Sequence, residues 1–309
     1  MNKMKILISP SSFGEISSKP FQMLESSGFD IIKNPYGRKL TESEVICLAK
    51  DCIGIIAGLE PLNSSVIDKL PSLRCISRVG VGMDNVDIDY ANSKRIKVLN
   101  TPDGPTRAVA ELTLGMTFSL LRRIPQADSN MKKQIWKKET GNLLFGKTIG
   151  IIGLGRIGRM VAEMFRALGN SVIGYDIAPD KQWAGINNIQ LCEFEHVLKF
   201  SDIITLHVPG SSDKKPLINK LELEHCKNSS IIINLTRGGV IDEKSLFEAL
   251  IGGKIKGAAI DVFDEEPYKG QLTGLDNVIL TPHIGSYASE GKLQMELDSV
   301  ENLINALKV

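Results

Sequence analysis

The sequence predicts an α/β protein with two lobes, each built on a parallel sheet, and three observations support this prediction. The chain has 309 residues, which is enough for about two domains of ordinary size. Short apolar runs alternate with longer amphipathic stretches, which is the pattern of successive strand–helix–strand units. A helix-length pattern at residues 106–123 separates two series of such units.

The elements of the first lobe follow from its apolar runs. These runs predict strands at residues 5–9, 29–32, 53–57 and 73–77. Amphipathic spacing predicts a helix at 42–50. The prolines and the glycine of residues 101–105 predict a turn that leads into the helix at 106–123.

The second lobe repeats this pattern. Further apolar runs predict strands at residues 148–152, 171–175, 202–208, 230–235, 257–262 and 278–280. A last helical pattern, residues 288–307, is long enough to return to the first lobe. We therefore expect one domain from residues 1–100 with 287–309 and another from 101–286, both with sheets of the Rossmann or flavodoxin type.

The composition excludes several classes of protein. Lys plus Arg number 37 and Asp plus Glu 36, so the net charge of +1 provides no broad positive field for nucleic acid. No apolar run reaches the roughly 18 residues of a membrane span. The five cysteines are scattered and show no metal-ligand spacing. We expect a cytoplasmic protein without a metal site, and a solvated helix face for the lysines of residues 132–138.

A glycine-rich turn is the most informative short motif. It follows the apolar run 148–152, opens a helical pattern, and reads Gly153, Leu154, Gly155, Arg156, Ile157, Gly158. In this context the glycines permit a tight turn, a close approach of the backbone to a pyrophosphate, and close helix packing. The motif predicts a dinucleotide site at the helix N-terminus.

Asp176 supports the same site. It ends the next predicted strand about 20 residues after the turn, where an acidic residue accepts hydrogen bonds from an adenosine ribose. A 2′-phosphate would meet this carboxylate, and no arginine follows it in residues 177–180. The sequence therefore favours NAD over NADP, with Lys181 as the nearest positive charge.

Polar residues follow three later strands. Arg237, Glu266 and His283 come after the runs 230–235, 257–262 and 278–280, and the carboxyl ends of parallel strands form the ligand crevice. An arginine fork pairs with a carboxylate, an imidazole transfers a proton, and a carboxylate orients the imidazole. This chemistry fits hydride transfer between a nicotinamide and a 2-keto or 2-hydroxy acid.

Each of these residues has a simpler interpretation when it is taken alone. A single arginine or glutamate at a strand end is more often a surface charge, and a single histidine is more often structural. Glu265 is an alternative to Glu266 for the same role. His207 ends another strand of this lobe, where it is expected to line the cofactor crevice.

Together with further segments, these residues resemble the D-isomer-specific 2-hydroxyacid dehydrogenase family, and its phosphoglycerate dehydrogenase branch most closely. The resemblance covers nearly the whole chain. Its segments are residues 77–87 (SRVGVGMDNVD), 109–111 (VAE), 153–158 with Asp176, 207–209 (HVP), 234–238 (NLTRG), 261–267 (DVFDEEP) and 281–285 (TPHIG).

The resemblance implies an NAD-dependent enzyme with its active site in the cleft between two lobes, and a homodimer built through the cofactor lobes. Arg237, Glu266 and His283 match the family's catalytic residues. Backbone N–H groups near Val79 and Gly80, next to Arg78, would hold the substrate carboxylate. Cofactor contacts would come from Asp261, facing the nicotinamide amide, and from Thr106, His207, Val208, Pro209 and Thr236.

The substrate is less clear than the reaction. Some members of the branch place a phosphate-binding arginine where this chain has Glu60, although Arg38, Lys39 and Arg78 are available to compensate. 3-Phosphoglycerate is the first expectation; hydroxypyruvate, glyoxylate, a lactate-like acid, phosphite and an NAD-sensing corepressor-like scaffold are the alternatives. The chain ends at Val309, so no serine-sensing regulatory domain is expected.

Overall fold

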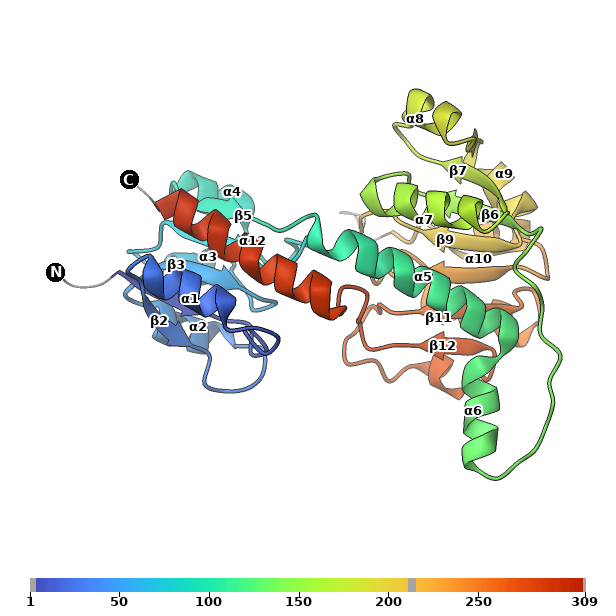
Figure 1. Cartoon of the computed structure of the whole chain (residues 1–309), viewed down its shortest axis with the longest axis horizontal. Coiled ribbons are helices and arrows are strands. Elements are labelled where there is room, and N and C mark those ends of the chain that lie inside the picture. Colours follow the sequence, from blue (N-terminus) through green and yellow to red (C-terminus); the bar gives the residue numbers. More distant parts are fainter. Residues whose placement is uncertain (1–3, 211–214, 308–309) are drawn as a thin grey trace. The chain divides into compact units, whose positions relative to one another are not determined.

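The computed structural model describes residues 4–210 and 215–307, which form two compact units (Figure 1). The first unit consists of the residues up to Pro105 and those from Ser286 onward, and the second is Thr106–Gly285. None of the helices in the described part of the chain has the length and apolar character of a membrane span.

The first unit contains a five-stranded parallel sheet. Its strands, in the order β2-β1-β3-β4-β5, are β1 (Lys5–Ile8), β2 (Asp30–Lys33), β3 (Cys52–Ala57), β4 (Cys75–Arg78) and β5 (Lys97–Leu99). Its helices are α1 (Lys19–Ser26), α2 (Glu42–Ala49), α3 (Ser64–Ile67), α4 (Ile88–Ser93) and α12 (Ser289–Leu307).

Alternation along the strands of this sheet creates two apolar cores. Leu7 and Ile55 pack with α2, α3 and α4 on one face, whereas Ile6, Ile8 and Ile56 pack with α1 and α12 on the other. Successive strand residues point to opposite faces, so helices on both sides require continuous apolar runs. The last helix thus completes the unit that begins the chain.

The second unit contains a seven-stranded parallel sheet in the order β12-β11-β10-β9-β6-β7-β8. Its strands are β6 (Thr148–Ile152), β7 (Ser171–Tyr175), β8 (Gln190–Leu191), β9 (Ile203–Leu206), β10 (Ile231–Asn234), β11 (Gly257–Ile260) and β12 (Val278–Leu280). Its α-helices are α5 (Gly104–Arg122, which starts two residues before the unit), α6 (Ile124–Lys132), α7 (Arg156–Ala167), α8 (Lys181–Ile186), α9 (Phe194–Phe200), α10 (Lys220–His225) and α11 (Glu243–Ile251), with one 3₁₀ turn, η1 (Gln271–Gly274).

Helices cover both faces of this sheet as well. One core joins the strands to α9, α10 and α11, and the other joins them to α5, α7 and α8. Two parallel sheets with helices on both faces confirm the predicted fold class.

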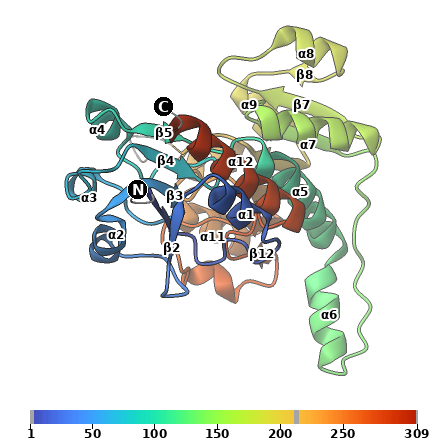
Figure 2. The same cartoon turned by 60° about the vertical axis from the view of Figure 1, so that its left-hand side comes forward.

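A projecting arm extends from the second unit. It comprises α6 and residues 133–147, and both views show it leaving the body of the unit (Figure 1, Figure 2). Arg123 has a left-handed backbone (φ 53°) between α5 and α6, which ends α5 and redirects the chain. The segment Lys133–Lys138 lies beyond the end of α6, so the predicted helix face was wrong for the lysines in it. These lysines are exposed to solvent, as predicted.

Candidate active site

The parallel sheet of the second unit brings five of the predicted site residues to one edge. Each follows the carboxyl end of a strand: Gly153 after β6, Asp176 after β7, His207 after β9, Arg237 after β10, and His283 after β12. The chain order reverses between the adjacent strands β6 and β9. Such a reversal opens a ligand crevice at the carboxyl edge of an α/β sheet.

The glycine-rich turn has space where a dinucleotide needs it. A Cβ at Gly153 would lie 2.4 Å from the His207 carbonyl oxygen, and a Cβ at Gly158 would lie 1.9 Å from the Gly153 carbonyl oxygen. A Cβ at Gly155 would meet nothing within 4 Å. Gly155 is the N-cap of α7 and no side chain caps this helix. Gly153 and Gly158 thus allow close packing, while Gly155 leaves uncapped N–H groups open to an anion.

Asp176 is held beside this turn. Its Oδ2 accepts a hydrogen bond from the Leu154 N–H at 2.6 Å, and its Oδ1 accepts one from the Ala178 N–H at 2.8 Å. These contacts fix a half-buried carboxylate at the end of β7. The turn and Asp176 therefore fit the pyrophosphate and the ribose of a dinucleotide.

His207 lies against the same turn. Thr205 Oγ1 is 3.0 Å from its Nε2, whereas its Nδ1 is buried without a hydrogen-bond partner among the described residues. Burial lowers the pKa of His207 to about 3, so the ring is neutral at physiological pH. Val208 is half-buried and Pro209 is exposed at the same strand end. Thr106 lies, half-buried, in the first turn of α5.

Arg237 follows β10 in a turn that Asn234 organises. Asn234 Oδ1 accepts hydrogen bonds from the Thr236 N–H and hydroxyl, and its amide donates to the Arg237 carbonyl oxygen. Arg237 Nη1 donates to the Thr236 carbonyl oxygen at 2.7 Å. Asn234 was not among the predicted site residues, although a buried asparagine at a strand end is a recognisable turn former.

The structure pairs His283 with Glu266. His283 Nδ1 lies 3.0 Å and 3.1 Å from the two carboxylate oxygens, and Glu266 Oε1 also accepts the Phe263 N–H. The two side chains are 41% and 40% exposed, so a small molecule has access to the pair. With Nδ1 held by the carboxylate, Nε2 is the ring nitrogen left to exchange a proton. Among the described residues, it is Glu266 and not the neighbouring Glu265 that contacts the ring.

Asp261 is fully buried between the ends of β11 and β12. Its carboxylate accepts hydrogen bonds from Thr281, Ile284 and Gly285, which belong to the turn that carries His283. Both oxygens therefore already have partners within the chain, whereas the family resemblance directed Asp261 toward the nicotinamide amide.

In the first unit, the expected carboxylate-binding N–H groups have other partners. The Val79 N–H donates to the Ala57 carbonyl oxygen at 2.9 Å, and the Gly80 N–H donates to Thr101 Oγ1 at 2.8 Å. The N–H groups of Val79 and Gly80 themselves therefore hold the turn, and donors near these two residues must come from elsewhere in it. The next two N–H groups of the turn, those of Val81 and Gly82, have no partner in the part of the chain that the structure describes.

Glu60 does not face a substrate. Its side chain is 1% exposed and turns back to accept the Gly58 N–H at 3.0 Å. Burial raises its pKa, while the Ser9 hydroxyl, the Gly58 N–H and the charge of Arg78 act in the opposite direction. Arg78 is itself only 8% exposed. Glu60, which stands where some relatives have a phosphate-binding arginine, therefore belongs to a buried polar cluster at the ends of β3 and β4.

Arg38 also has a partner. Its two terminal nitrogens bind the two Glu44 carboxylate oxygens at 2.9 Å and 2.7 Å, and Glu44 completes a capping box with Thr41 at the start of α2. Lys39 is exposed next to this pair.

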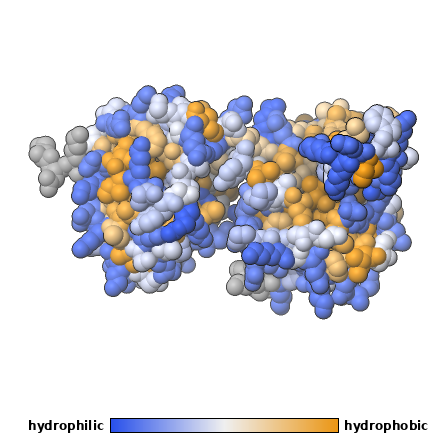
Figure 3. All heavy atoms as spheres, turned by 90° about the horizontal axis from the view of Figure 1, so that it is seen from below, coloured by the Kyte–Doolittle hydropathy of each residue, from blue (hydrophilic) through white to orange (hydrophobic). Residues whose placement is uncertain are grey.

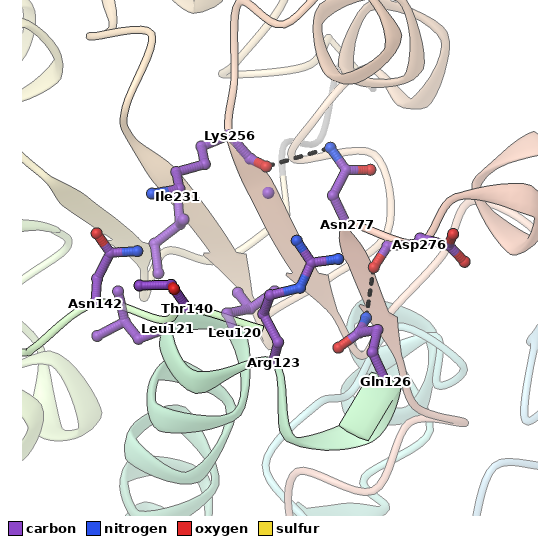
Figure 4. A pocket seen from close by; sticks show the side chains of 11 residues that line it. Leu120, Leu121, Arg123, Gln126, Thr140, Asn142, Ile231, Lys256, Asp276 and Asn277 are labelled. Atoms are coloured by element: carbon purple, nitrogen blue, oxygen red, sulfur yellow. Dashed lines mark hydrogen bonds between the residues drawn. The ribbon is translucent and has the colours of Figure 1, made fainter. Parts of the chain in front are cut away.

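A cavity of about 150 Å³ lies at the opposite edge of the second sheet (Figure 4). Ile231 and Gly257, which begin β10 and β11, line it together with Arg123 and Asn142. Its polar groups bond to one another, as in the 3.2 Å contact of the Asn277 amide with the Lys256 carbonyl oxygen. The cavity is separate from the edge that carries the dinucleotide turn. Within residues 4–210 and 215–307, no group of His, Cys, Asp and Glu side chains has the arrangement of a metal site.

Comparison with known proteins agrees with this geometry. Residues 114–285 match the family model described as D-isomer specific 2-hydroxyacid dehydrogenase, NAD binding domain. The D-3-phosphoglycerate dehydrogenase of Methanocaldococcus jannaschii is 42% identical over 82% of this chain and 49% of its own length. The hydroxypyruvate reductase of Thermotoga maritima is 36% identical over 82% of this chain and 84% of its own length.

Solved structures give the same result for the whole chain. The crystal structure of the TT0316 protein from Thermus thermophilus has a TM-score of 0.90 at 30% identity, covering 98% of this chain and 97% of that one. The chain spans about half the length of the phosphoglycerate dehydrogenases that it matches.

Proposed function

The chain belongs to the D-isomer specific 2-hydroxyacid dehydrogenase family, and we propose that it interconverts a D-2-hydroxy acid and its 2-keto acid with NAD. The second unit is the NAD binding domain of this family. One observation carries the proposal: the His283–Glu266 pair lies at the same sheet edge as the dinucleotide turn. A proton donor and a hydride source are the two requirements of keto-acid reduction.

The side chains have distinct roles in this reaction. Bound NADH supplies the hydride. His283 donates a proton from Nε2 to the carbonyl oxygen of the keto acid, and Glu266 holds the ring by Nδ1. Arg237 binds the substrate carboxylate with its fork and polarises the carbonyl group. In the reverse direction His283 accepts the hydroxyl proton.

The first unit is proposed to bind the substrate carboxylate through the N–H groups of Val81 and Gly82. These two N–H groups follow a turn that is fixed by Val79 and Gly80. Val81 is 42% exposed, so its backbone is accessible to a small acid.

The substrate that we propose first is 3-phosphoglycerate, on the strength of the 42% identity to a phosphoglycerate dehydrogenase. Hydroxypyruvate is the second candidate, and a structural observation favours it. A phosphate needs cations, yet Arg38 is bound by Glu44 and Arg78 is buried beside Glu60. Of the three cations expected to bind a phosphate, Lys39 is the one that is exposed next to the Arg38–Glu44 pair.

Steady-state rates test the proposal. The wild-type protein is assayed with 3-phosphohydroxypyruvate, hydroxypyruvate, glyoxylate and pyruvate, each with NADH and with NADPH. We expect a higher kcat/KM with NADH, because Asp176 opposes a 2′-phosphate, and a higher kcat/KM with the phosphorylated acid. Lys39→Met should reduce only the phosphorylated rate, with Lys33→Met as the matched control.

Other results would change the conclusion. Equal or faster turnover of hydroxypyruvate identifies a hydroxypyruvate reductase. Tight NADH binding without turnover of any acid contradicts the proposed enzyme and supports a cofactor-sensing binding protein.

The proposal includes a homodimer formed through the arm of the second unit. The arm exposes Ile135, Trp136, Leu143 and Phe145, and Trp136 and Phe145 are 79% and 76% exposed. Apolar surface is also visible on this unit among hydrophilic side chains (Figure 3). Large apolar side chains on a projecting segment are typical of a protein–protein contact.

A further inference from the structure

One buried carboxylate holds the turn that carries His283. Asp261 Oδ1 accepts the Thr281 hydroxyl at 2.5 Å and the Ile284 N–H at 2.8 Å, and Oδ2 accepts the Gly285 N–H at 2.8 Å. Asp261 is itself fixed, because it follows β11 directly and its N–H donates to the Asn234 carbonyl oxygen. The carboxylate therefore contacts the turn on both sides of His283.

The turn needs such support. His283 has a left-handed backbone (φ 54°), a conformation that costs a non-glycine residue about 1 to 2 kcal/mol. Its N–H reaches only back to the Thr281 carbonyl oxygen. The imidazole nevertheless has to present Nδ1 to Glu266, which belongs to a different loop. An unusual backbone angle persists where its surroundings determine it, and here the surroundings are the Asp261 contacts.

We propose that Asp261 and Thr281 are positioning residues that hold the His283 turn so that the imidazole meets Glu266. The proposal rests on the proposed function, in which His283 exchanges the proton. In this proposal Asp261 acts on His283 through the turn. Thr281 has a role that its place in the motif of residues 281–285 did not suggest.

The hydroxyl of Thr281 is the group that makes this link on the strand side. The Thr281 backbone is already fixed, because its N–H donates to the Ile260 carbonyl oxygen at 3.1 Å. Valine has the same shape as threonine without the hydroxyl, and serine keeps the hydroxyl without the methyl group. Comparison of these two substitutions separates the hydrogen bond from packing.

The experiment measures Thr281→Val and Thr281→Ser beside the wild type. We expect Thr281→Val to lower kcat about 10-fold. This is a part of the roughly 10²- to 10⁴-fold rate enhancement that a positioned proton donor provides. Thr281→Ser should retain most of the activity. The Kd for NADH, from fluorescence titration, should be unchanged in both variants, and thermal melting checks that they fold.

A second comparison shows whether Thr281 acts through His283. In a His283→Ala background, Thr281→Val should cause no further loss of the residual rate, because the ring that it positions is absent. Equal losses with and without His283 would overturn the proposal. So would a weaker NADH affinity in Asp261→Asn, because this result assigns the carboxylate to the cofactor amide.

A readout without turnover separates this proposal from the proposed function. In ¹⁵N-histidine NMR spectra, the wild type and Thr281→Ser should show a His283 Nδ1 proton that is hydrogen-bonded to Glu266, and Thr281→Val should lose it. If the wild type turns over no acid but shows this pattern, the proposed function fails and the positioning role stands. If the signal is the same in all three proteins, the positioning role fails.

Discussion

The His283–Glu266 contact is the part of the molecule on which the proposed reaction depends most directly. Both side chains are partly exposed, and the carboxylate is fixed by the Phe263 N–H as well as by the ring. The ring is thus oriented by the protein before any substrate arrives. An oriented acid requires little reorganisation during the reaction.

His283→Ala is expected to reduce kcat by about 10²-fold or more, because no other proton donor takes its place. NADH binding should persist, since the dinucleotide turn and Asp176 are unchanged. Single-turnover kinetics and NADH titration measure the two effects. Loss of NADH binding in this variant would place His283 outside the proton-transfer role.

Two neighbouring glutamates provide a matched control for this site. Glu266→Gln should lower kcat, because a neutral amide has one acceptor oxygen and holds the ring less firmly than a carboxylate whose two oxygens both lie near Nδ1. Glu265→Gln should leave kcat within about twofold, because Glu265 makes no contact with His283 in the structure. The reverse result would assign the orienting role to Glu265.

Arg237→Lys tests whether geometry matters as well as charge. Lysine keeps the charge but cannot bond a carboxylate with two parallel N–H groups. Charge-assisted hydrogen bonds are worth roughly 1.5 to 3 kcal/mol, so kcat/KM should fall about 10-fold or more. A value near that of the wild type would remove Arg237 from the substrate site.

The sequence predicted which candidate residues gather at the edge of the second sheet, but not which neighbours they contact. The sequence located Arg237, Glu266 and His283, but spacing could not choose Glu266 over Glu265. It also predicted carboxylate-binding N–H groups near Val79 and Gly80, and it could not exclude those of Val79 and Gly80 themselves. Only the fold shows that these donate to Ala57 and Thr101, since those partners are distant along the chain.

At the scale of elements, the turn between β6 and α7 uses its glycines for two different purposes. Gly158→Ala should destabilise the protein by several kcal/mol, because its Cβ would overlap the Gly153 carbonyl oxygen. Gly155→Ala should leave the melting temperature nearly unchanged, because open space surrounds that position, and should weaken NADH binding instead. Thermal melting and NADH titration distinguish the two variants. Equal effects on stability would contradict this division of roles.

Helix α12 carries a buried carboxylate with a predictable pH effect. Glu296 is 1% exposed, accepts the Gly14 N–H at 3.1 Å, and has its pKa raised by burial. Because its pKa is raised in the folded state, Glu296 contributes to stability at pH values below its ordinary pKa of 4.5. This contribution is lost as the pH rises through the folded-state pKa.

Glu296→Gln keeps an acceptor for the Gly14 N–H and cannot ionise. The urea midpoint of the variant should therefore exceed that of the wild type by an amount that grows from pH 5 to pH 8. Lys292 and Glu15, the charged neighbours, are present in both proteins. A difference that grows on acidification instead would contradict the sign of the shift.

Most elements were predictable from apolar patterns, and the exceptions share a cause. β1, β3 and β6 lie in long apolar runs and were predicted to within a residue or two. β5 and β8 are edge strands of three and two residues, partly exposed, so they carry no apolar run to detect. The burial of Glu60 was also not predictable from the sequence, because the polar residues that surround it lie at the ends of separate strands.

At the scale of the whole molecule, the arm is expected to pair two copies of the chain. Trp136→Glu combined with Phe145→Glu should shift the protein toward the monomer, because charge on an apolar contact opposes association. Sedimentation velocity measures the change, and Ile177→Glu, which alters a 91% exposed residue outside the arm, is the control. A wild type that sediments as a monomer would contradict the proposed dimer.

The two units of the chain are completed at different times during synthesis, and α12 is the reason. A ribosome releases all five strands of the first sheet by residue 99, but residues 289–307, which cover one face of it, emerge only after the whole second unit. Until then Ile6, Ile8 and Cys75 lack the apolar cover of Val300 and Leu303. All elements of the second unit have been synthesised once residue 285 has emerged. The nascent first sheet is therefore the surface that a ribosome-associated chaperone would meet for longest.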